Sequence, residues 1–193
     1  MYKLCKTEQS AKRQRQLEEG LLRMMSFTRY EEITVSSLCD FLKVPRKSFY
    51  RYFSSKDGAL HALIDHTLIQ YEGLSLIYLP GEKRTLQREL THFFQFWIAQ
   101  NDLLDALVRC NLSGMLVERS MAVATSMNGM PARFLPNDAP EVRRQVILFC
   151  VCGLMSMVLS WHREGYPQSV NQMAAIAVRL ICQPLFPHIE DLL

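Results

Sequence analysis

Apolar residues recur along this chain at the three- and four-residue spacings of an α-helix, and no segment alternates convincingly with the period of two expected of a strand. A short example with one narrow apolar face is formed by Val35, Leu38, Cys39 and Leu42. Because helical periodicity continues through almost the whole sequence, it predicts an all-α fold.

Caps and prolines divide this pattern into separate helices. The first are predicted over residues 7–28, 34–42, 45–53 and 55–72, and the later ones over 85–100, 102–110, 112–127, 140–163 and 169–183. Thr34, Ser55 and Asp138 are candidate N-caps, since their side-chain oxygens can accept from free backbone N–H groups. Pro45 and Pro140 fit the first turn of a helix, where no needed donor is lost.

One stretch, VPRKSFYRYFSSKDG at residues 44–58, combines cations with aromatic side chains. On a helical wheel Phe49 and Phe53 lie about 40° apart, which predicts that they form the buried face. Lys47 and Arg51 then fall on the opposite side. A basic solvated face needs no function, so an ordinary surface helix is the alternative interpretation.

Further features of this stretch favour a surface that binds phosphates. Tyr50 and Tyr52 lie on the flanks of the helix, where their hydroxyls can donate to phosphates that border a groove. The preceding helix is short and ends about three residues earlier, as in a helix-turn-helix motif. Ser55 and Lys56 begin the next helix, which offers free backbone N–H groups and a cation to a phosphate. Arg46 lies in the first turn of the basic helix and points toward whatever the N-terminus of that helix enters.

Charge is distributed unevenly along the sequence. The net charge of the 193-residue chain is +3, but residues 1–60 hold twelve Lys or Arg and seven Asp or Glu, whereas the rest holds ten and twelve. The excess of cations is therefore confined to the N-terminal third, as expected if that part meets a polyanion. A hydrophobic content of 49% provides for a sizeable core.

The sequence gives no positive indication of catalysis, a cofactor or a metal. Its six cysteines form no CxxC pair, and its five histidines form no HExxH or other close pair. The phosphate and nucleophile motifs GxxxxGK[ST], GxGxxG and GxSxG do not occur. We therefore expect no enzyme, no cofactor and no metal site.

Two features bear on location. The N-terminal sequence MYKLCKTEQSAKRQRQ lacks the apolar region of a secretory signal, which predicts a cytoplasmic protein. The longest apolar run, Ile147–Trp161, has fifteen residues and falls short of the roughly twenty that span a bilayer. A buried helix explains this run better, so no membrane association is expected.

From the second predicted helix onward the sequence resembles the DNA-binding domain of the tetracycline-repressor (TetR) family of bacterial transcription regulators. The resemblance covers about residues 10–65 and rests on Thr34-Val35, Leu38, Val44, Ser48-Phe49-Tyr50-Arg51-Tyr52-Phe53, Ser55-Lys56-Asp57 and Leu60. It implies a three-helix helix-turn-helix domain at residues 1–55 and an all-helical effector-binding and dimerisation domain at 56–193. It also implies a homodimer that binds palindromic double-stranded DNA and, as a repressor, releases it when a small apolar or amphipathic effector binds.

The resemblance also implies roles for single residues. Those near the DNA are Thr34 and Ser36 at the start of the supporting helix, Arg46, Lys47, Ser48 and Arg51 in the major groove, and Tyr50, Tyr52 and Lys56 at backbone phosphates. Three positions depart from the family pattern, since Lys43 and Arg29 stand where glycine is usual and Pro45 replaces a small polar cap. A non-glycine residue in a left-handed turn costs about 1 kcal/mol, so adjusted turns are expected.

The last two predicted helices are apolar on more than one face, and such helices must be buried on several sides. In a domain this small a second copy is the simplest partner, giving a four-helix interface, and a central position in a monomer is the alternative. The residues expected in the dimer interface are Val146, Phe149, Gly153, Met157, Met173, Ala177 and Leu180.

Residues between the DNA module and these helices suit the wall of an apolar effector cavity, which is mostly aromatic and aliphatic. The candidates are Phe93, Trp97, Leu107, Met115, Phe149 and Trp161. Ordinary core packing is the competing interpretation for each of them.

A second hypothesis concerns Phe27 and Phe41, which stand where members of the family are normally polar. Exposed aromatic side chains indicate a partner surface. Under this hypothesis the chain is a helical DNA-binding factor that acts through a partner protein instead of a small-molecule effector.

Overall fold

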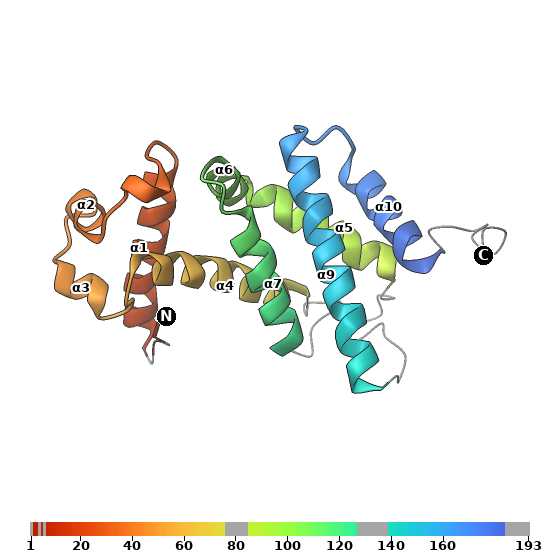
Figure 1. The fold of residues 1–193 in the computed structure, drawn as a ribbon, viewed down its shortest axis with the longest axis horizontal. Coiled ribbons are helices and arrows are strands. Elements are labelled where there is room, and N and C mark those ends of the chain that lie inside the picture. Colours follow the sequence, from red (N-terminus) through yellow and green to blue (C-terminus); the bar gives the residue numbers. More distant parts are fainter. Residues whose placement is uncertain (1, 4, 6, 76–84, 127–138, 184–193) are drawn as a thin grey trace. The chain divides into compact units, whose positions relative to one another are not determined.

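The computed structural model describes residues 2–3, 5, 7–75, 85–126 and 139–183 and confirms the predicted all-α fold (Figure 1). In these residues regular structure is helical apart from a single antiparallel bridge between Tyr2 and Phe53. The chain forms two compact units. The first comprises Met1–Gln70 and Asn101–Val123, and the second comprises Tyr71–Gln100 and Ala124–Leu193.

The first unit is built from the N-terminal helices and two later ones. Its elements are α1 (Glu8–Met25), the 3₁₀ turn η1 (Tyr30–Glu32), α2 (Val35–Phe41), α3 (Arg46–Tyr50), most of α4 (Lys56–Ser75), α6 (Asn101–Arg109) and most of α7 (Ser113–Ser126). The second unit contains α5 (Leu86–Ala99), α9 (Pro140–Arg163) and α10 (Val170–Cys182). These units divide the chain differently from the expected boundary at residue 55, because α6 and most of α7 pack with the N-terminal helices.

Side-chain caps begin several helices where the sequence predicts them. Thr34 accepts from Ser37 N at 3.0 Å in a capping box, and Ser55 Oγ accepts from Gly58 N at 3.1 Å. Asp138, the expected cap of α9, lies outside the described residues, and that helix has Ala139 at its N-cap with Pro140 in the first turn. Local cap chemistry therefore fixes the starts of α2 and α4.

The core of the first unit forms where α1 and α2 approach closely. Leu17, Leu21 and Leu38 are at most 1% exposed. A Cβ atom placed on Gly20 would lie 2.5 Å from Leu42 Cδ1, so any larger residue here must displace the Leu42 side chain. Burial of the apolar faces along this contact supplies the main stabilisation of the helix pair.

The turn between α2 and α3 is left-handed at Lys43, whose φ is +55°. Glycine adopts this conformation without the steric cost that a Cβ atom adds. Arg29, the other position where glycine is usual, is instead extended with φ −64° and ψ 140°. The backbone therefore avoids the left-handed conformation at Arg29 but keeps it at Lys43.

We predict that Lys43→Gly raises the free energy of unfolding by roughly 0.5–1 kcal/mol, because the relief of steric cost exceeds the extra entropy of the unfolded chain. Arg29→Gly is the matched control and should lower stability slightly, since its extended backbone gains nothing from glycine. Urea unfolding of the two variants measures both changes. Shifts of the same sign would contradict the assignment of strain to Lys43.

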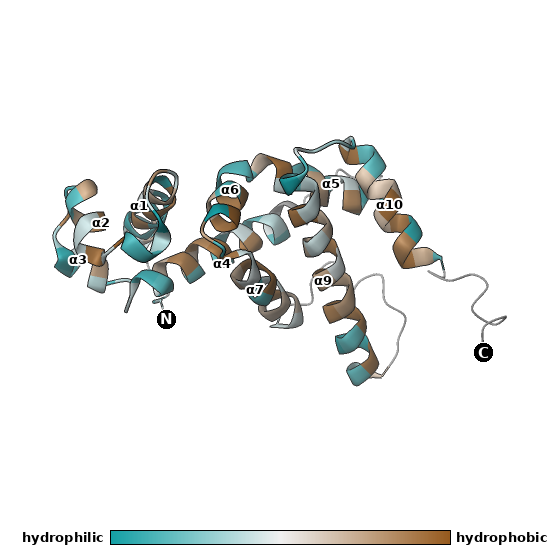
Figure 2. Cartoon of the chain, turned by 45° about the horizontal axis from the view of Figure 1, so that its top comes forward, coloured by the Kyte–Doolittle hydropathy of each residue, from teal (hydrophilic) through white to brown (hydrophobic). Residues whose placement is uncertain are grey.

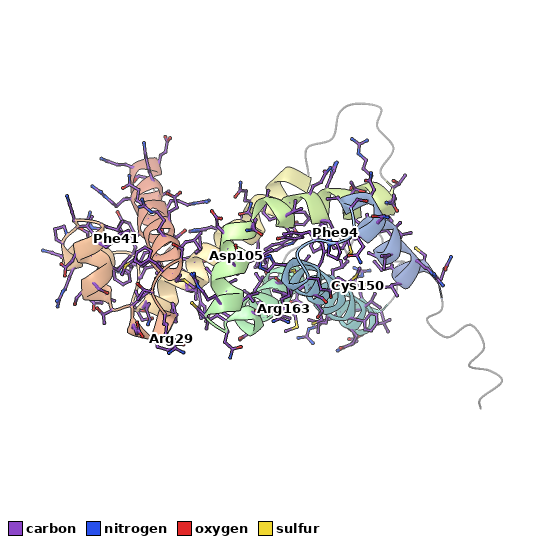
Figure 3. All side chains as sticks on the ribbon, turned by 90° about the horizontal axis from the view of Figure 1, so that it is seen from above. Arg29, Phe41, Phe94, Asp105, Cys150 and Arg163 are labelled. Atoms are coloured by element: carbon purple, nitrogen blue, oxygen red, sulfur yellow. The ribbon has the colours of Figure 1, made fainter. Side chains whose placement is uncertain are left out.

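The second unit is held together by aromatic side chains. Helix α10 packs along α5, and α5 also contacts α9. Phe94 on α5, labelled in Figure 3, meets Trp161 on α9 edge to face with ring centroids 5.6 Å apart. Tyr71 lies against Phe93 and Phe96 at centroid distances of 5.6 and 5.2 Å, and burial raises the pKa of its hydroxyl.

Candidate nucleic-acid interface

Helices α2 and α3 are consecutive short helices that pack together across a turn in the first unit (Figure 1). Leu42 N and Val44 N donate to Leu38 O and Cys39 O, which closes the end of α2. Pro45 occupies the N-cap of α3 without a side-chain cap, and Ser48 N donates to Pro45 O at 2.8 Å. Phe49 is fully buried and packs on Phe53 with centroids 5.1 Å apart, as predicted for the buried face.

The opposite face of α3 carries exposed cations. Arg46, Lys47 and Arg51 are all exposed, and among the residues that the structure describes no carboxylate forms an ion pair with them. Tyr50 is 53% exposed on the flank, and Ser48 is half-buried. The surface therefore presents three guanidinium or ammonium groups beside one tyrosine, a combination that suits phosphate and base-edge contacts.

Tyr52 does not lie on that surface, contrary to the helical-wheel prediction. Its side chain is 6% exposed. The α-helix ends at Tyr50, and Tyr52 N donates to Phe49 O in a tighter turn, so helical spacing no longer sets the direction of the Tyr52 side chain. We therefore omit Tyr52 from the interface that we propose.

Lys56 is also engaged inside the fold. Its Nζ donates to Tyr30 O at 2.5 Å and lies 4.1 Å from the centre of the Tyr30 ring. The Tyr30 hydroxyl donates to Asp57 Oδ1 at 2.7 Å, and burial followed by this bond raises the pKa of Tyr30. Lys56 thus fastens the loop before α2 to the start of α4, and a phosphate must compete with Tyr30 for its ammonium group.

The remaining expected DNA contacts lie at the start of α2. Thr34 is exposed and Ser36 is half-buried. Thr34 Oγ1 accepts from Ser37 N, so the Thr34 side chain caps the N-terminus of α2. The backbone and side chains here remain accessible to a phosphate near the helix N-terminus.

The expected dimer residues of α9 lie along one accessible stripe. Phe149 is 71% exposed, Gly153 is exposed, and Val146 and Met157 are half-buried. Val142, one turn earlier, is 50% exposed. Figure 2 shows the apolar colouring along this helix. An exposed apolar stripe of this length indicates a surface that is covered by a partner.

The expected dimer residues of α10 divide between two faces. Met173 and Ala177 are 6% and 1% exposed and belong to the buried face of α10, which packs along α5. Leu180 is 42% exposed, as is Ile181, and Ile176 is 43% exposed. Met173 and Ala177 are therefore core residues of this chain, and the accessible apolar side chains of α10 are those at 176, 180 and 181.

By its 24-residue length and its composition alone, α9 is also able to cross a membrane, the one such helix in the described part of the chain. Leu154, Val158 and Trp161 on α9 are nevertheless buried among protein side chains. The expectation of no membrane association stays a prediction.

The expected effector residues are divided between the two units. Phe93, Trp97 and Trp161 are buried in the second unit, whereas Leu107 and Met115 belong to the first unit and Phe149 is exposed. Trp97 is 1% exposed, and its Nε1–H has no hydrogen-bond partner within the described residues. A buried donor without an acceptor costs about 1–3 kcal/mol, so this indole is a ready anchor for an acceptor group.

A cavity of about 530 Å³ lies elsewhere, at the ends of α1 and α6 in the first unit. It is lined by Ser26, Phe27, Thr28, Arg29, Glu31, Arg109, Cys110 and Asn111. Arg109 donates to Ser26 O across it and so caps the C-terminus of α1. None of the expected effector residues lines this cavity.

Sequence reasoning missed a second set of polar residues in the first unit. Tyr2, Asp65 and Arg119 are joined by hydrogen bonds although they lie 63 and 54 residues apart along the chain. No local spacing could reveal such a set. The bond from the Tyr30 hydroxyl to Asp57 likewise joins residues 27 positions apart, so only the fold reveals it.

No protein-family model matches this sequence, and neither does any curated protein. Solved structures do match. A TetR transcriptional regulator from Streptococcus agalactiae 2603V shares 16% identity at a TM-score of 0.64, covering 90% of this chain and 95% of that chain. The fatty acid degradation regulator FadR from Bacillus halodurans shares 13% identity at a TM-score of 0.57, covering 94% and 98%.

The TetR family repressor AlkX from Dietzia sp. strain DQ12-45-1b is similar in the same way. It shares 15% identity at a TM-score of 0.55, covering 87% of this chain and 92% of that chain. At identities this low the likeness establishes the fold. The chain therefore has the all-helical fold of TetR transcription regulators, and the resemblance in the sequence is confirmed at that level.

Proposed function

We propose that this protein is a dimeric, ligand-responsive transcription repressor that binds palindromic operator DNA through α3. The observation that carries the proposal is the exposed cationic face of α3, set on a buried Phe49 and flanked by an exposed Tyr50. A helix of this kind enters the major groove, where arginine and lysine read guanine edges. Arg46, Lys47, Ser48 and Arg51 are the proposed groove contacts.

The proposed dimer forms through the apolar stripe of α9 and the accessible side chains of α10. Phe149 is its central residue, because an aromatic side chain that is 71% exposed in one chain gains most from burial. Two recognition helices then read half-sites about 34–36 Å apart on one face of the duplex. A ligand that changes this spacing weakens operator binding.

The proposed effector binds in the second unit at Trp97. The walls of the proposed site are Phe93, Trp97 and Trp161. The indole N–H of Trp97, which has no acceptor among the described residues, selects a molecule that carries an acceptor group on an apolar body. We infer an amphipathic carboxylate, ester or ketone as the chemical class. Its binding separates these aromatic side chains, which form part of the core when it is absent.

The proposal is tested with duplexes selected from a random DNA pool. Lys47→Ala and Arg51→Ala should weaken operator binding and change which bases are preferred, each by about 1–3 kcal/mol. Tyr50→Phe should weaken binding to all sequences alike, since its hydroxyl meets phosphate. Fluorescence anisotropy on the selected duplex and on a scrambled one separates these effects.

Arg163→Ala is the control, because this exposed arginine lies in the second unit and outside the proposed interface. It should leave operator affinity unchanged. Failure to select any duplex would overturn the proposed role of α3. An equal loss of operator affinity in the three α3 variants and in Arg163→Ala would overturn it as well.

A second candidate function is recruitment of a protein partner. Phe27 and Phe41 are 65% and 44% exposed and lie together with ring centroids 5.9 Å apart, beside the guanidinium of Arg23 (Figure 3 labels Phe41). This aromatic pair favours a binding surface in the DNA-reading unit itself. Thermal unfolding against a small-molecule library discriminates the two functions, because an effector raises Tm by mass action.

A further inference from the structure

The N-terminal segment is fastened to the end of the recognition helix. Lys3 N donates to Tyr52 O at 3.0 Å, and Tyr2 forms an antiparallel bridge with Phe53. These residues lie directly after Arg51, the last cation of the DNA-reading face. Tyr2 and Lys3, which we call the N-terminal strap, therefore pair with the backbone that follows α3.

The strap is held in turn by α4. The Tyr2 hydroxyl donates to Asp65 Oδ2 at 2.8 Å, and its ring meets the edge of His66 with centroids 5.6 Å apart. Burial, followed by the bond to Asp65, raises the pKa of Tyr2 to about 12. The hydroxyl is therefore protonated and a donor throughout the neutral range, and the strap stays fastened to α4 at any physiological pH.

Asp65 is held by α7. It is 3% exposed, and its carboxylate accepts from Arg119 Nε at 2.7 Å and from Arg119 Nη2 at 2.5 Å. The bond to Asp65 raises the pKa of Arg119, so its guanidinium stays charged. A bidentate pair of this kind fixes the position of the carboxylate as well as its charge. If Arg119 moves away, the buried carboxylate loses its charged partner and is no longer fixed in position, so the group that holds the Tyr2 hydroxyl is free to move.

A second polar contact lies under the same segment. Glu18 on α1 is fully buried, and its Oε2 forms a hydrogen bond of 2.9 Å with His66 Nδ1. Cys5 Sγ donates to Gln14 Oε1 at 2.7 Å. The Glu18–His66 contact joins α1 to α4, and the Cys5–Gln14 contact joins the N-terminal segment to α1. Among the hydrogen bonds of the described residues, the route from Arg119 through Asp65 and Tyr2 links α7 to the end of α3.

We propose that Tyr2 and Lys3 are positioning residues for the recognition helix, and that the Asp65–Arg119 pair sets how firmly they hold it. A displacement of α7 then loosens the strap and lets the end of α3 move. The consequence for DNA rests on the proposed function, whereas the link from Arg119 to Lys3 is a property of the fold alone.

Amide hydrogen exchange of the intact protein tests the link without DNA. The Lys3 amide should be protected relative to the free peptide, and Tyr2→Phe and Arg119→Lys should each reduce this protection about tenfold. Tyr2→Phe removes only a hydroxyl, and Arg119→Lys keeps the positive charge while it removes the bidentate geometry. Circular dichroism of each variant checks that the fold is retained. Tyr166→Phe is the matched control, since it removes a tyrosine hydroxyl that contacts His162 Nδ1 at 2.8 Å in the second unit. It should leave Lys3 unchanged.

Two outcomes would overturn the link. An unprotected Lys3 amide in the wild-type protein would show that the strap is not fastened. Protection that survives Arg119→Lys would show that the strap does not depend on α7.

Operator affinity tests the positioning role. Tyr2→Phe should lower affinity for the selected operator about tenfold while affinity for scrambled duplex stays the same, because only base readout needs α3 in register. Equal losses on both duplexes, or no loss, would overturn positioning. Failure of the wild-type protein to bind any duplex would refute the proposed function and the positioning role together, and the exchange result would still decide the link to α7.

Discussion

Replacing Phe49 with alanine is expected to lower the free energy of unfolding by about 3–5 kcal/mol. The Phe49 ring is fully buried between α3 and the rest of the first unit, and it stacks on Phe53 at 5.1 Å. Removal leaves a cavity that a five-residue helix such as α3 has no means of filling. Because domains are stable by only about 5–15 kcal/mol, this loss removes a large part of the stability of the first unit.

The matched control for this change is Tyr50→Ala, the neighbouring aromatic residue. Tyr50 is 53% exposed, so its truncation should cost under about 1 kcal/mol of stability although it removes a proposed phosphate contact. Thermal unfolding followed by circular dichroism measures both variants. Similar losses for the two would mean that the buried face of α3 does not anchor the helix-turn-helix pair.

The Phe149→Asp variant is expected to dissociate the proposed dimer, raising its dissociation constant by about 100-fold or more. The wild-type side chain is 71% exposed in one chain, so the substitution places a charge in the intersubunit contact without disturbing the core of the monomer. Operator affinity should fall with it, because two linked recognition helices bind far more tightly than one. Sedimentation velocity over a range of protein concentrations measures the dissociation constant.

Phe27→Asp is the matched control for Phe149→Asp. Phe27 is 65% exposed in the first unit, so the same change of charge and size occurs outside the proposed contact. It should leave the dimer intact. A wild-type protein that sediments as a monomer, or a Phe149→Asp variant that stays dimeric, would remove the basis for the α9 interface.

Helix identity and helix starts could be predicted from the sequence, because both depend on groups three or four residues apart. The capping box at Thr34, the cap at Ser55 and the buried Phe49–Phe53 pair all follow from spacing that is the same in any helix. The TetR-like fold also followed, since its motif is continuous in sequence. The exposed positions of Lys47 and Arg51 are consequences of the same geometry.

Prediction from helical spacing was wrong where a helix ends before its pattern of apolar and polar residues does. Helical spacing places Tyr52 at the margin of a helix that continues to residue 53, but α3 ends at Tyr50 and Tyr52 turns inward. Met173 and Ala177 were assigned to the dimer contact because α10 is apolar on several faces. Which apolar face meets α5 depends on the partner helix, which no property of α10 alone specifies.

By itself, then, the sequence determined the all-α class, the helix-turn-helix pair and the cationic face of α3, since each is set by contacts within a few residues. Only the tertiary structure decided that Lys56 is held by Tyr30, that Phe149 is accessible while Met173 is buried, and that Arg119 reaches Tyr2 through Asp65. The physical reason is that these contacts join residues far apart in the chain. Their energy depends on how whole helices pack, and packing is a property of the assembled surfaces rather than of any one segment.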